Sequence, residues 1–142
     1  MNYLLDTNIL SEGAKPRPEP GVVAWLADLD EDRAFVSVVT MAELRQGIER
    51  LTPGARRDRL ELWLRDELSA RFEGRILPID TAIADAWGRV MARARAAGRP
   101  VGAMDAGLAA TAAAHGLVLV TRNTADFAVL GLDLLNPWYA AP

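Results

Sequence analysis

Short apolar runs alternate with longer segments of helical periodicity along the whole chain. Five runs read as strands, and they cover residues 2–6, 34–39, 75–79, 117–121 and 132–135. Pro78 favours an edge position for the third run, because proline has no N–H to donate within a sheet. Strands that alternate with helices are typical of an α/β fold with a mainly parallel sheet. No repeat or linker divides the sequence, so we expect one domain over residues 1–142.

The segments between these runs carry apolar residues at helical spacing. Such stripes occupy residues 22–29, 41–51, 60–72 and 83–94. A further segment, 103–114, consists mostly of Ala, Gly and Leu and is closed by Gly116. Because its side chains are small, we expect this helix to lie close to the sheet.

The composition restricts the chemistry that the chain can perform. It has no cysteine and one histidine, His115, which excludes zinc fingers, thiol nucleophiles and sites with several histidines. Any metal must therefore bind oxygen ligands, which points to hard cations such as Mg²⁺ or Mn²⁺. No apolar run approaches the roughly 18–20 residues that span a membrane. Asp6 interrupts the first apolar run and no basic segment precedes it, so we expect a cytoplasmic protein.

Four acidic residues occupy corresponding places in this pattern. Asp6 ends the first run, Glu43 lies in the first turn after the second, Asp105 begins the Ala-rich helix and Asp126 follows the fourth run. In parallel α/β sheets, sites form at the carboxyl ends of the strands, where the strand order reverses. If the first and fourth strands are neighbours, the four acids converge. Such a pocket suits a cation that activates water and shields a phosphodiester under attack.

Alternative interpretations remain open at this point. An acid after a strand is often only a helix cap, and capping is sufficient to explain Asp80. A phosphate-accepting or phosphatase site also places an Asp after the first strand. It usually needs a lysine near the phosphate, and the only lysine, Lys15, lies in an early loop. An acidic pocket that simply binds the basic segment of a partner is the other alternative.

Four motifs together resemble a known family. LLDTNIL, SVVTMAEL, DAGLAATAAAHG and LVTRNTADF occur in the order and spacing of the PIN-domain ribonucleases. The chain is most similar to the VapC toxins of bacterial toxin–antitoxin pairs, including the FitB-like subgroup. The resemblance covers nearly the whole sequence. It implies a three-layer sandwich in which helices flank a mainly parallel five-stranded sheet.

The resemblance also implies an activity and a set of partners. The expected protein is a Mg²⁺- or Mn²⁺-dependent endoribonuclease, the toxin of a type II pair. It would form a homodimer and bind a VapB-like antitoxin, and it would reach DNA only through that antitoxin. The four family acids fall on Asp6, Glu43, Asp105 and Asp126, and the polar helper falls on Thr121, with Asn123 close by. We expect Asp6 and Asp105 to bind the principal metal directly, with Glu43 and Asp126 completing the acidic cluster.

Other side chains near these motifs are weaker candidates. Ser37 or Thr40 would act beside Glu43 as Thr121 does beside Asp6. Arg45 is the best candidate among the arginines for a contact with RNA phosphate, because it lies two residues from Glu43. The tryptophans at apolar helical positions are expected in the core or at an interface; these are Trp25, Trp63 and Trp87. Trp138 and Tyr139 are expected to fold back on the body or to meet a second copy.

Overall fold

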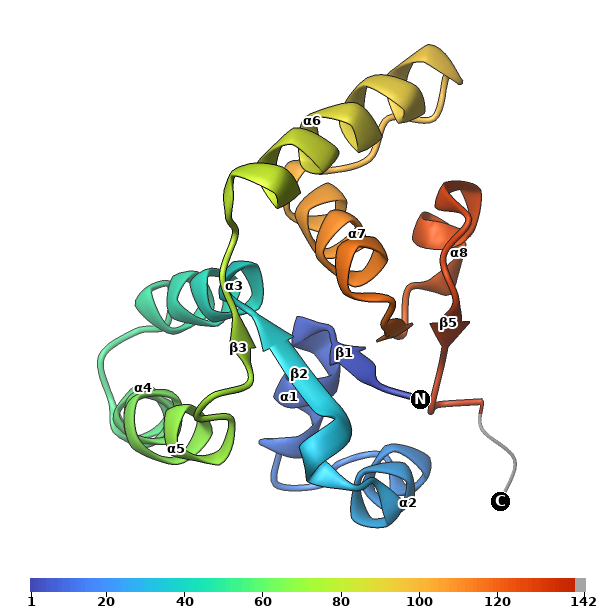
Figure 1. The fold of residues 1–142 in the computed structure, drawn as a ribbon. Helices are drawn as coiled ribbons and strands as arrows, with labels where there is room; N and C mark the ends of the chain where they lie inside the picture. The colour runs from blue at the N-terminus through green and yellow to red at the C-terminus, as the bar shows by residue number, and fades with distance from the viewer. Residues whose placement is uncertain (140–142) are drawn as a thin grey trace.

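The computed structural model describes residues 1–139, and Figure 1 shows its ribbon. Its strands are β1 (Tyr3–Leu5), β2 (Ala34–Ser37), β3 (Ile76–Leu77), β4 (Val118–Val120) and β5 (Leu134–Leu135). The α-helices are α1 (Thr7–Gly13), α2 (Pro20–Asp28), α3 (Val38–Glu49), α4 (Ala55–Leu62), α5 (Ser69–Arg71), α6 (Thr81–Ala96), α7 (Ala103–His115) and α8 (Thr124–Phe127). Three shorter or irregular helical segments complete it: η1 (Glu31–Arg33), the π-helical η2 (Trp63–Leu68) and η3 (Ala128–Leu130).

The five strands form one parallel sheet in the order β3-β2-β1-β4-β5. The predicted parallel sheet is confirmed, and β3 lies at an edge as Pro78 indicated. The chain adds β2 and then β3 on one side of β1, and then crosses back so that β4 pairs with the other side of β1. The strand order therefore reverses between β1 and β4, which places a crevice at their carboxyl ends.

Alternating side chains of the strands pack against two separate helical layers. Leu4 and Leu119 belong to a buried cluster with residues of α7 and α8. Leu5, Val36 and Val120 point to the opposite face and pack with residues of α1, α3 and η2 and with Phe72. Figure 1 shows α6 and α7 on one side of the sheet and α1 and α2 on the other. The three-layer sandwich is thus confirmed.

Helix α7 packs against the sheet, as its small residues predicted, since Leu108 and Ala112 share a buried cluster with Leu4 and Leu119. A Cβ atom at Gly107 would lie 3.2 Å from both the Trp87 ring of α6 and a Val39 methyl group of α3. Only glycine allows so close an approach without displacing these neighbours. The helix ends at Gly116, which adopts the left-handed conformation with φ of 63°. This tight packing fixes the first turn of α7, which carries Asp105.

Two boundaries differ from the predicted ones for local reasons. The strand expected over 34–39 ends at Ser37, whose Oγ accepts a hydrogen bond from the Val39 N–H at 3.0 Å and so starts α3. The seven-residue helix α1 was not predicted. It begins because the Asp6 carboxylate accepts the Thr7 N–H at 2.6 Å.

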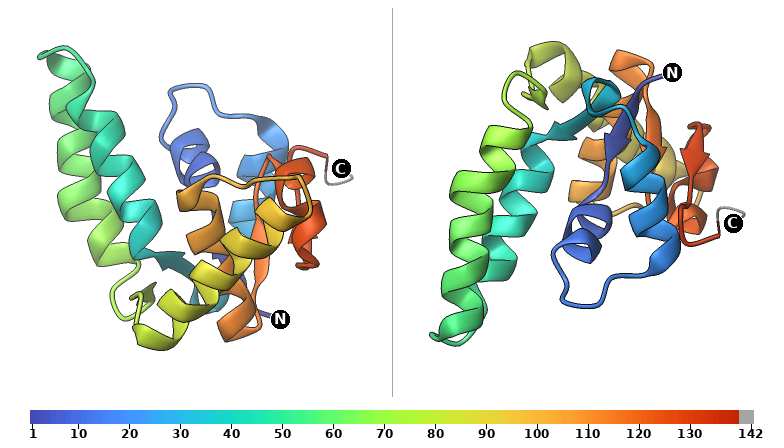
Figure 2. Two further views of the ribbon diagram at one scale, coloured as in Figure 1. Left: turned by 90° about the horizontal axis from the view of Figure 1, so that it is seen from above. Right: turned by 90° about the horizontal axis from the view of Figure 1, so that it is seen from below.

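Helix α3 and the continuous helical segment formed by α4, η2 and α5 run side by side as a hairpin, which Figure 2 shows in two views. We call this hairpin the helical arm. It agrees with the stripes predicted over 41–51 and 60–72, although the second contains a π-helical stretch. Within residues 1–139, no helix is both long enough and apolar enough to cross a membrane.

Candidate active site

Asp6 and Thr121 lie at the carboxyl ends of the neighbouring strands β1 and β4. The Thr121 hydroxyl donates to Asp6 Oδ2 at 2.8 Å, and both residues are buried, with 5% and 0% of their surface exposed. The Asn123 N–H donates to Thr121 Oγ1 at 3.1 Å. The structure therefore brings together Asp6 and the predicted helper Thr121, and Asn123 contributes through its backbone.

Glu43 reaches the same crevice from the first half of α3. Its Oε1 accepts a hydrogen bond from the Thr7 hydroxyl at 2.9 Å. Thr7 is the residue directly after Asp6, so this bond ties the Glu43 carboxylate to the end of β1. Thr7 lies inside the LLDTNIL motif, but its place in the sequence does not indicate this contact.

Asp105 and Asp126 both line a separate cavity beside α7. The cavity has a volume of about 380 Å³, and its lining includes Asp105 from the first turn of α7, Asp126 from α8 and Arg99 from the preceding loop. We call it the α7 cavity. Asp105 is half-buried, whereas Asp126 is exposed. Glu43 lines a different opening, so the structure does not place all four predicted acids in one pocket.

Three of these carboxyl groups have raised pKa values. Burial raises the pKa of Asp6 above its ordinary value, although two hydrogen bonds act in the opposite direction. Burial also raises the pKa of Glu43, and the charges of Asp6 and Asp105 raise it further. The pKa of Asp105 is raised by burial and then by the charges of Asp6 and Asp126. We call Glu43, Asp6, Asp105 and Asp126 the acidic row.

Within residues 1–139, no ion pair joins a basic side chain to any acid of this row. In these residues Asp6 and Glu43 accept hydrogen bonds only from hydroxyl and amide donors. Such a set of oxygen atoms fits a hard divalent cation. No three histidine, aspartate or glutamate side chains of the described part already close around one point. The metal ligands consequently stay a prediction.

A groove opens from the other end of the acidic row, between α1 and the helical arm. Its volume is about 320 Å³. Thr7 and Glu43 line its inner end, and Lys15, Arg56 and Arg59 line it farther along, among mostly apolar side chains. We call it the α1–α3 groove. The acidic row is therefore flanked by two openings, and each includes basic residues.

Comparison with known proteins agrees with this geometry. A family model of the PIN domain matches residues 3–131. The chain belongs to this family. The PIN domain is 38% identical over 138 residues to the VapC ribonuclease Y4jK of Sinorhizobium fredii, which covers 97% of this chain and 99% of the relative. It is 38% identical over 136 residues to the toxin FitB of Neisseria gonorrhoeae, and this match covers 96% of this chain and 98% of FitB. Among solved structures, FitAB bound to a DNA fragment matches with a TM-score of 0.91 and 34% identity, covering 99% of this chain and 98% of the other.

The phosphatase alternative is not supported in this PIN domain. Lys15 Nζ lies 3.0 Å from Glu12 Oε1, and the pair closes the turn after α1. Glu12 Oε2 also accepts the Glu19 N–H at 3.1 Å, so Glu12 organises the loop that leads to α2. Lys15 therefore has a structural partner and makes no hydrogen bond to Asp6 in the described residues.

Two hydroxyls proposed beside Glu43 have different surroundings. Ser37 is buried, and its Oγ accepts the Val39 N–H and so caps α3. Thr40 is also buried, one turn before Glu43, and its hydroxyl has no hydrogen-bond partner within residues 1–139. Ser37 is therefore a capping residue, whereas the role of Thr40 beside Glu43 stays a prediction.

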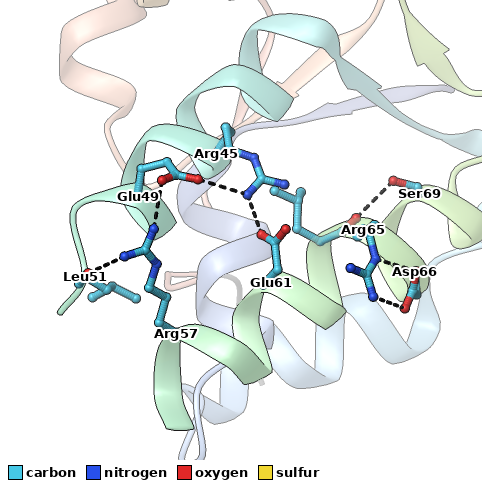
Figure 3. Close-up of polar contacts among 9 residues, drawn as sticks. Arg45, Glu49, Leu51, Arg57, Glu61, Arg65, Asp66 and Ser69 are labelled. Atoms are coloured by element: carbon cyan, nitrogen blue, oxygen red, sulfur yellow. Dashed lines mark hydrogen bonds and ion pairs between the residues drawn. The ribbon is translucent and has the colours of Figure 1, made fainter. Parts of the chain in front are cut away.

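Arg45 points away from the acidic row. Residues two apart on a helix do not share a face. Figure 3 shows its guanidinium between Glu49 of α3 and Glu61 of α4. Arg57 extends the network by pairing with Glu49 at 2.8 Å. These ion pairs join the two halves of the helical arm. Arg45 therefore pairs with acids of the arm and does not lie at the acidic row.

The tryptophans have the packing roles that their spacing predicted. Trp25 meets Tyr3 edge to face with ring centres 5.4 Å apart, and Trp63 packs against the core beneath the arm. Trp87 also donates its indole N–H to the Ala103 carbonyl at 2.8 Å. Trp138 folds back on the body, where the Arg122 guanidinium lies 5.2 Å from its ring centre. Tyr139 is 86% exposed.

Proposed function

We propose that this PIN domain is a Mg²⁺- or Mn²⁺-dependent endoribonuclease and the toxin of a type II toxin–antitoxin pair. One observation carries the proposal: the buried Asp6 carboxylate is held by Thr121 where the strand order reverses, and Glu43 is tied to the same strand end through Thr7. Burial raises the pKa values of Asp6, Glu43 and Asp105 there. The names of the two relatives, a ribonuclease and a toxin, support the same activity. A site that accumulates negative charge without basic partners suits chemistry that requires a cation.

Asp6 and Asp105 would hold the cation directly, and Glu43 and Asp126 would complete its surroundings. When bound, a divalent cation activates water and stabilises the charge that builds up on a phosphodiester during hydrolysis. The Thr121 hydroxyl donates to Asp6 Oδ2 and so holds that carboxylate in one orientation. Glu43 accepts the Thr7 hydroxyl through one oxygen. Its other oxygen remains available to accept a proton from the attacking water.

The two openings offer a path for RNA across the acidic row. Arg99 lines the α7 cavity, and Arg56 and Arg59 line the α1–α3 groove. Phosphates on either side of the cleaved bond would meet these cations, which position a strand without reading its sequence. This distribution explains how a chain with a formal net charge of −3 can still bind RNA.

The first test is metal-dependent cleavage by the chain freed of any antitoxin. We expect RNA to be cut with Mg²⁺ or Mn²⁺, to stay intact with excess EDTA, and to be cut again when the metal is restored. The measurement is gel analysis of a defined RNA. A chain that binds a basic peptide but leaves RNA intact under all metal conditions would favour the alternative of a purely binding module.

We also propose the partners that the resemblance implied. The FitAB structure contains DNA, and its similarity to this chain supports a VapB-like antitoxin that carries the contact with DNA. The homodimer stays a prediction. Its two-fold arrangement would place two acidic rows along one groove. A cytoplasmic location accords with a toxin that acts on RNA.

The acidic row predicts how an antitoxin inhibits. A guanidinium pairs with carboxylates through a planar fork and keeps its charge at any working pH. We expect an antitoxin arginine to reach Asp6, Glu43 or Asp105. Replacing that arginine by alanine should restore RNA cleavage in the complex while most of the affinity remains, because the rest of the interface still holds the chains together. Cleavage assays and calorimetry on the same complex measure the two effects. If the alanine variant of the antitoxin still inhibits cleavage fully, the antitoxin inhibits by a mechanism that does not need this arginine.

A further inference from the structure

The first turn of α1 connects three parts of the acidic site. We propose that Thr7 and Asn8 are positioning residues: Thr7 orients the Glu43 carboxylate, and Asn8 holds the Asp6–Thr121 pair against the loop that follows β4. The inference rests on the proposed function. It goes beyond it because neither residue belongs to the four acids or to the helper at Thr121.

Thr7 makes one hydrogen bond to each of two acids. Its backbone N–H donates to Asp6 Oδ1 at 2.6 Å, and its hydroxyl donates to Glu43 Oε1 at 2.9 Å. A glutamate side chain has three rotatable bonds, so an isolated Glu43 would sample many positions over the crevice. The hydroxyl belongs to a β-branched residue at the start of a helix, where its side-chain rotation is restricted. Thr7 therefore fixes Glu43 relative to Asp6.

Asn8 has donors and acceptors arranged to match its neighbours. Its Nδ2 lies 3.4 Å from Asp6 Oδ2 and 3.4 Å from Thr121 Oγ1, and its Oδ1 accepts the Arg122 N–H at 3.2 Å. The Asp6 carboxylate is only an acceptor. Thr121 gives its single proton to Asp6, so its oxygen also accepts. The reversed amide would oppose acceptors to acceptors, so one orientation satisfies all the contacts.

The Arg122 peptide is held from both sides, and this provides a matched control. Asn8 accepts its N–H, and Asn136 Nδ2 donates to its carbonyl oxygen at 3.2 Å. Both asparagines therefore anchor the same loop. Of the two, only Asn8 also reaches Asp6 and Thr121, whereas Asn136 Oδ1 accepts the Trp138 N–H at 2.9 Å. A role in the loop alone would make the two residues equivalent, whereas a positioning role would separate them.

The Thr7 test removes the hydroxyl at nearly constant volume. Thr7→Val should weaken Mn²⁺ binding measured by calorimetry and lower kcat for RNA cleavage by roughly 10- to 100-fold, the range typical when a partner of a ligating side chain is lost. KM should change much less, because no substrate contact is removed. Thr7→Ser keeps the hydroxyl and should recover most of both quantities. Wild-type values for Thr7→Val, or no recovery in Thr7→Ser, would overturn the role of Thr7.

The Asn8 test compares Asn8→Leu with Asn136→Leu. Asn8→Leu should reduce Mn²⁺ affinity and kcat by roughly 10-fold or more, whereas Asn136→Leu should leave both close to wild type. If both variants lose Mn²⁺ affinity and kcat equally, Asn8 only anchors the loop and does not position the site. Circular dichroism confirms folding, and Asn8→Ala replaces Asn8→Leu if the leucine is not accommodated.

Failure of the inference and failure of the proposed function give different results. If the wild-type chain binds Mn²⁺ but cleaves no RNA, the function is wrong and the calorimetry still decides the roles of Thr7 and Asn8. If the wild type cleaves RNA and both variants match it, the function stands and the inference is wrong. If the wild type does not bind Mn²⁺, both are wrong.

Discussion

The Asp6→Asn variant is expected to lose RNA cleavage almost completely while its fold survives. A bound cation contributes several kcal/mol of charge stabilisation, and about 1.4 kcal/mol corresponds to a tenfold rate, so the loss should be on the order of 1000-fold or greater. Asparagine is as good a helix cap as aspartate, so α1 should still form. The change also removes a buried charge whose pKa is raised by burial. The melting temperature without metal should therefore be unchanged or higher.

Asp80→Asn is the matched control for this substitution. Asp80 also follows a strand and caps a helix, since its Oδ1 accepts the Ile83 N–H at 2.8 Å. The capping role predicted for it is confirmed. It contacts none of the acids of the site, so Asp80→Asn should retain wild-type cleavage. Asp105→Asn should behave like Asp6→Asn, with loss of Mn²⁺ binding in calorimetry. Wild-type cleavage and metal affinity in both site variants would refute the assignment of the ligands.

Much of this site was predictable because topology places it. Parallel strands end at the same edge of a sheet, so the position of Asp6 after one run and Thr121 after another was enough to bring them together. The convergence depended on the first and fourth strands being neighbours, and they do pair, with Leu5 opposite Val120. The Ala-rich segment likewise predicted the helix that carries Asp105.

Contacts between distant side chains were not predictable in the same way. Arg45 lies near Glu43 in sequence, but its partner Glu61 comes from the other half of the helical arm. Helix α1 has seven residues, which is too short for a periodic pattern to reveal. The sequence pattern therefore did not indicate the contacts of Thr7 and Asn8, because these depend on the short helix that Asp6 caps. The motif contained both residues, but it did not show what they bind.

Burial of the acidic row links metal binding to pH. The raised pKa values of Asp6, Glu43 and Asp105 mean that the folded chain binds protons more tightly than the unfolded chain. Their contribution to stability is fully present below the unfolded pKa values, near 4 for carboxyl groups. It is lost as the pH rises through the folded pKa values. As the pH rises without metal, the folded chain therefore carries a growing cost of repulsion among these carboxylates.

Thermal melting should consequently show a stabilisation by Mg²⁺ or Mn²⁺ that grows with pH. The cation binds the ionised row of the folded chain and relieves its repulsion. At one hundred times the dissociation constant this contributes about 2.7 kcal/mol, or roughly 5–10 °C for a domain of this size. The shift should be largest near pH 8 and vanish near pH 4, where protons occupy the same oxygens. Asp6→Asn should abolish most of it, and Asp80→Asn should preserve it. A shift of equal size at both pH values would mean that the metal binds elsewhere, because only ionised carboxylates of the row make the stabilisation depend on pH in this direction.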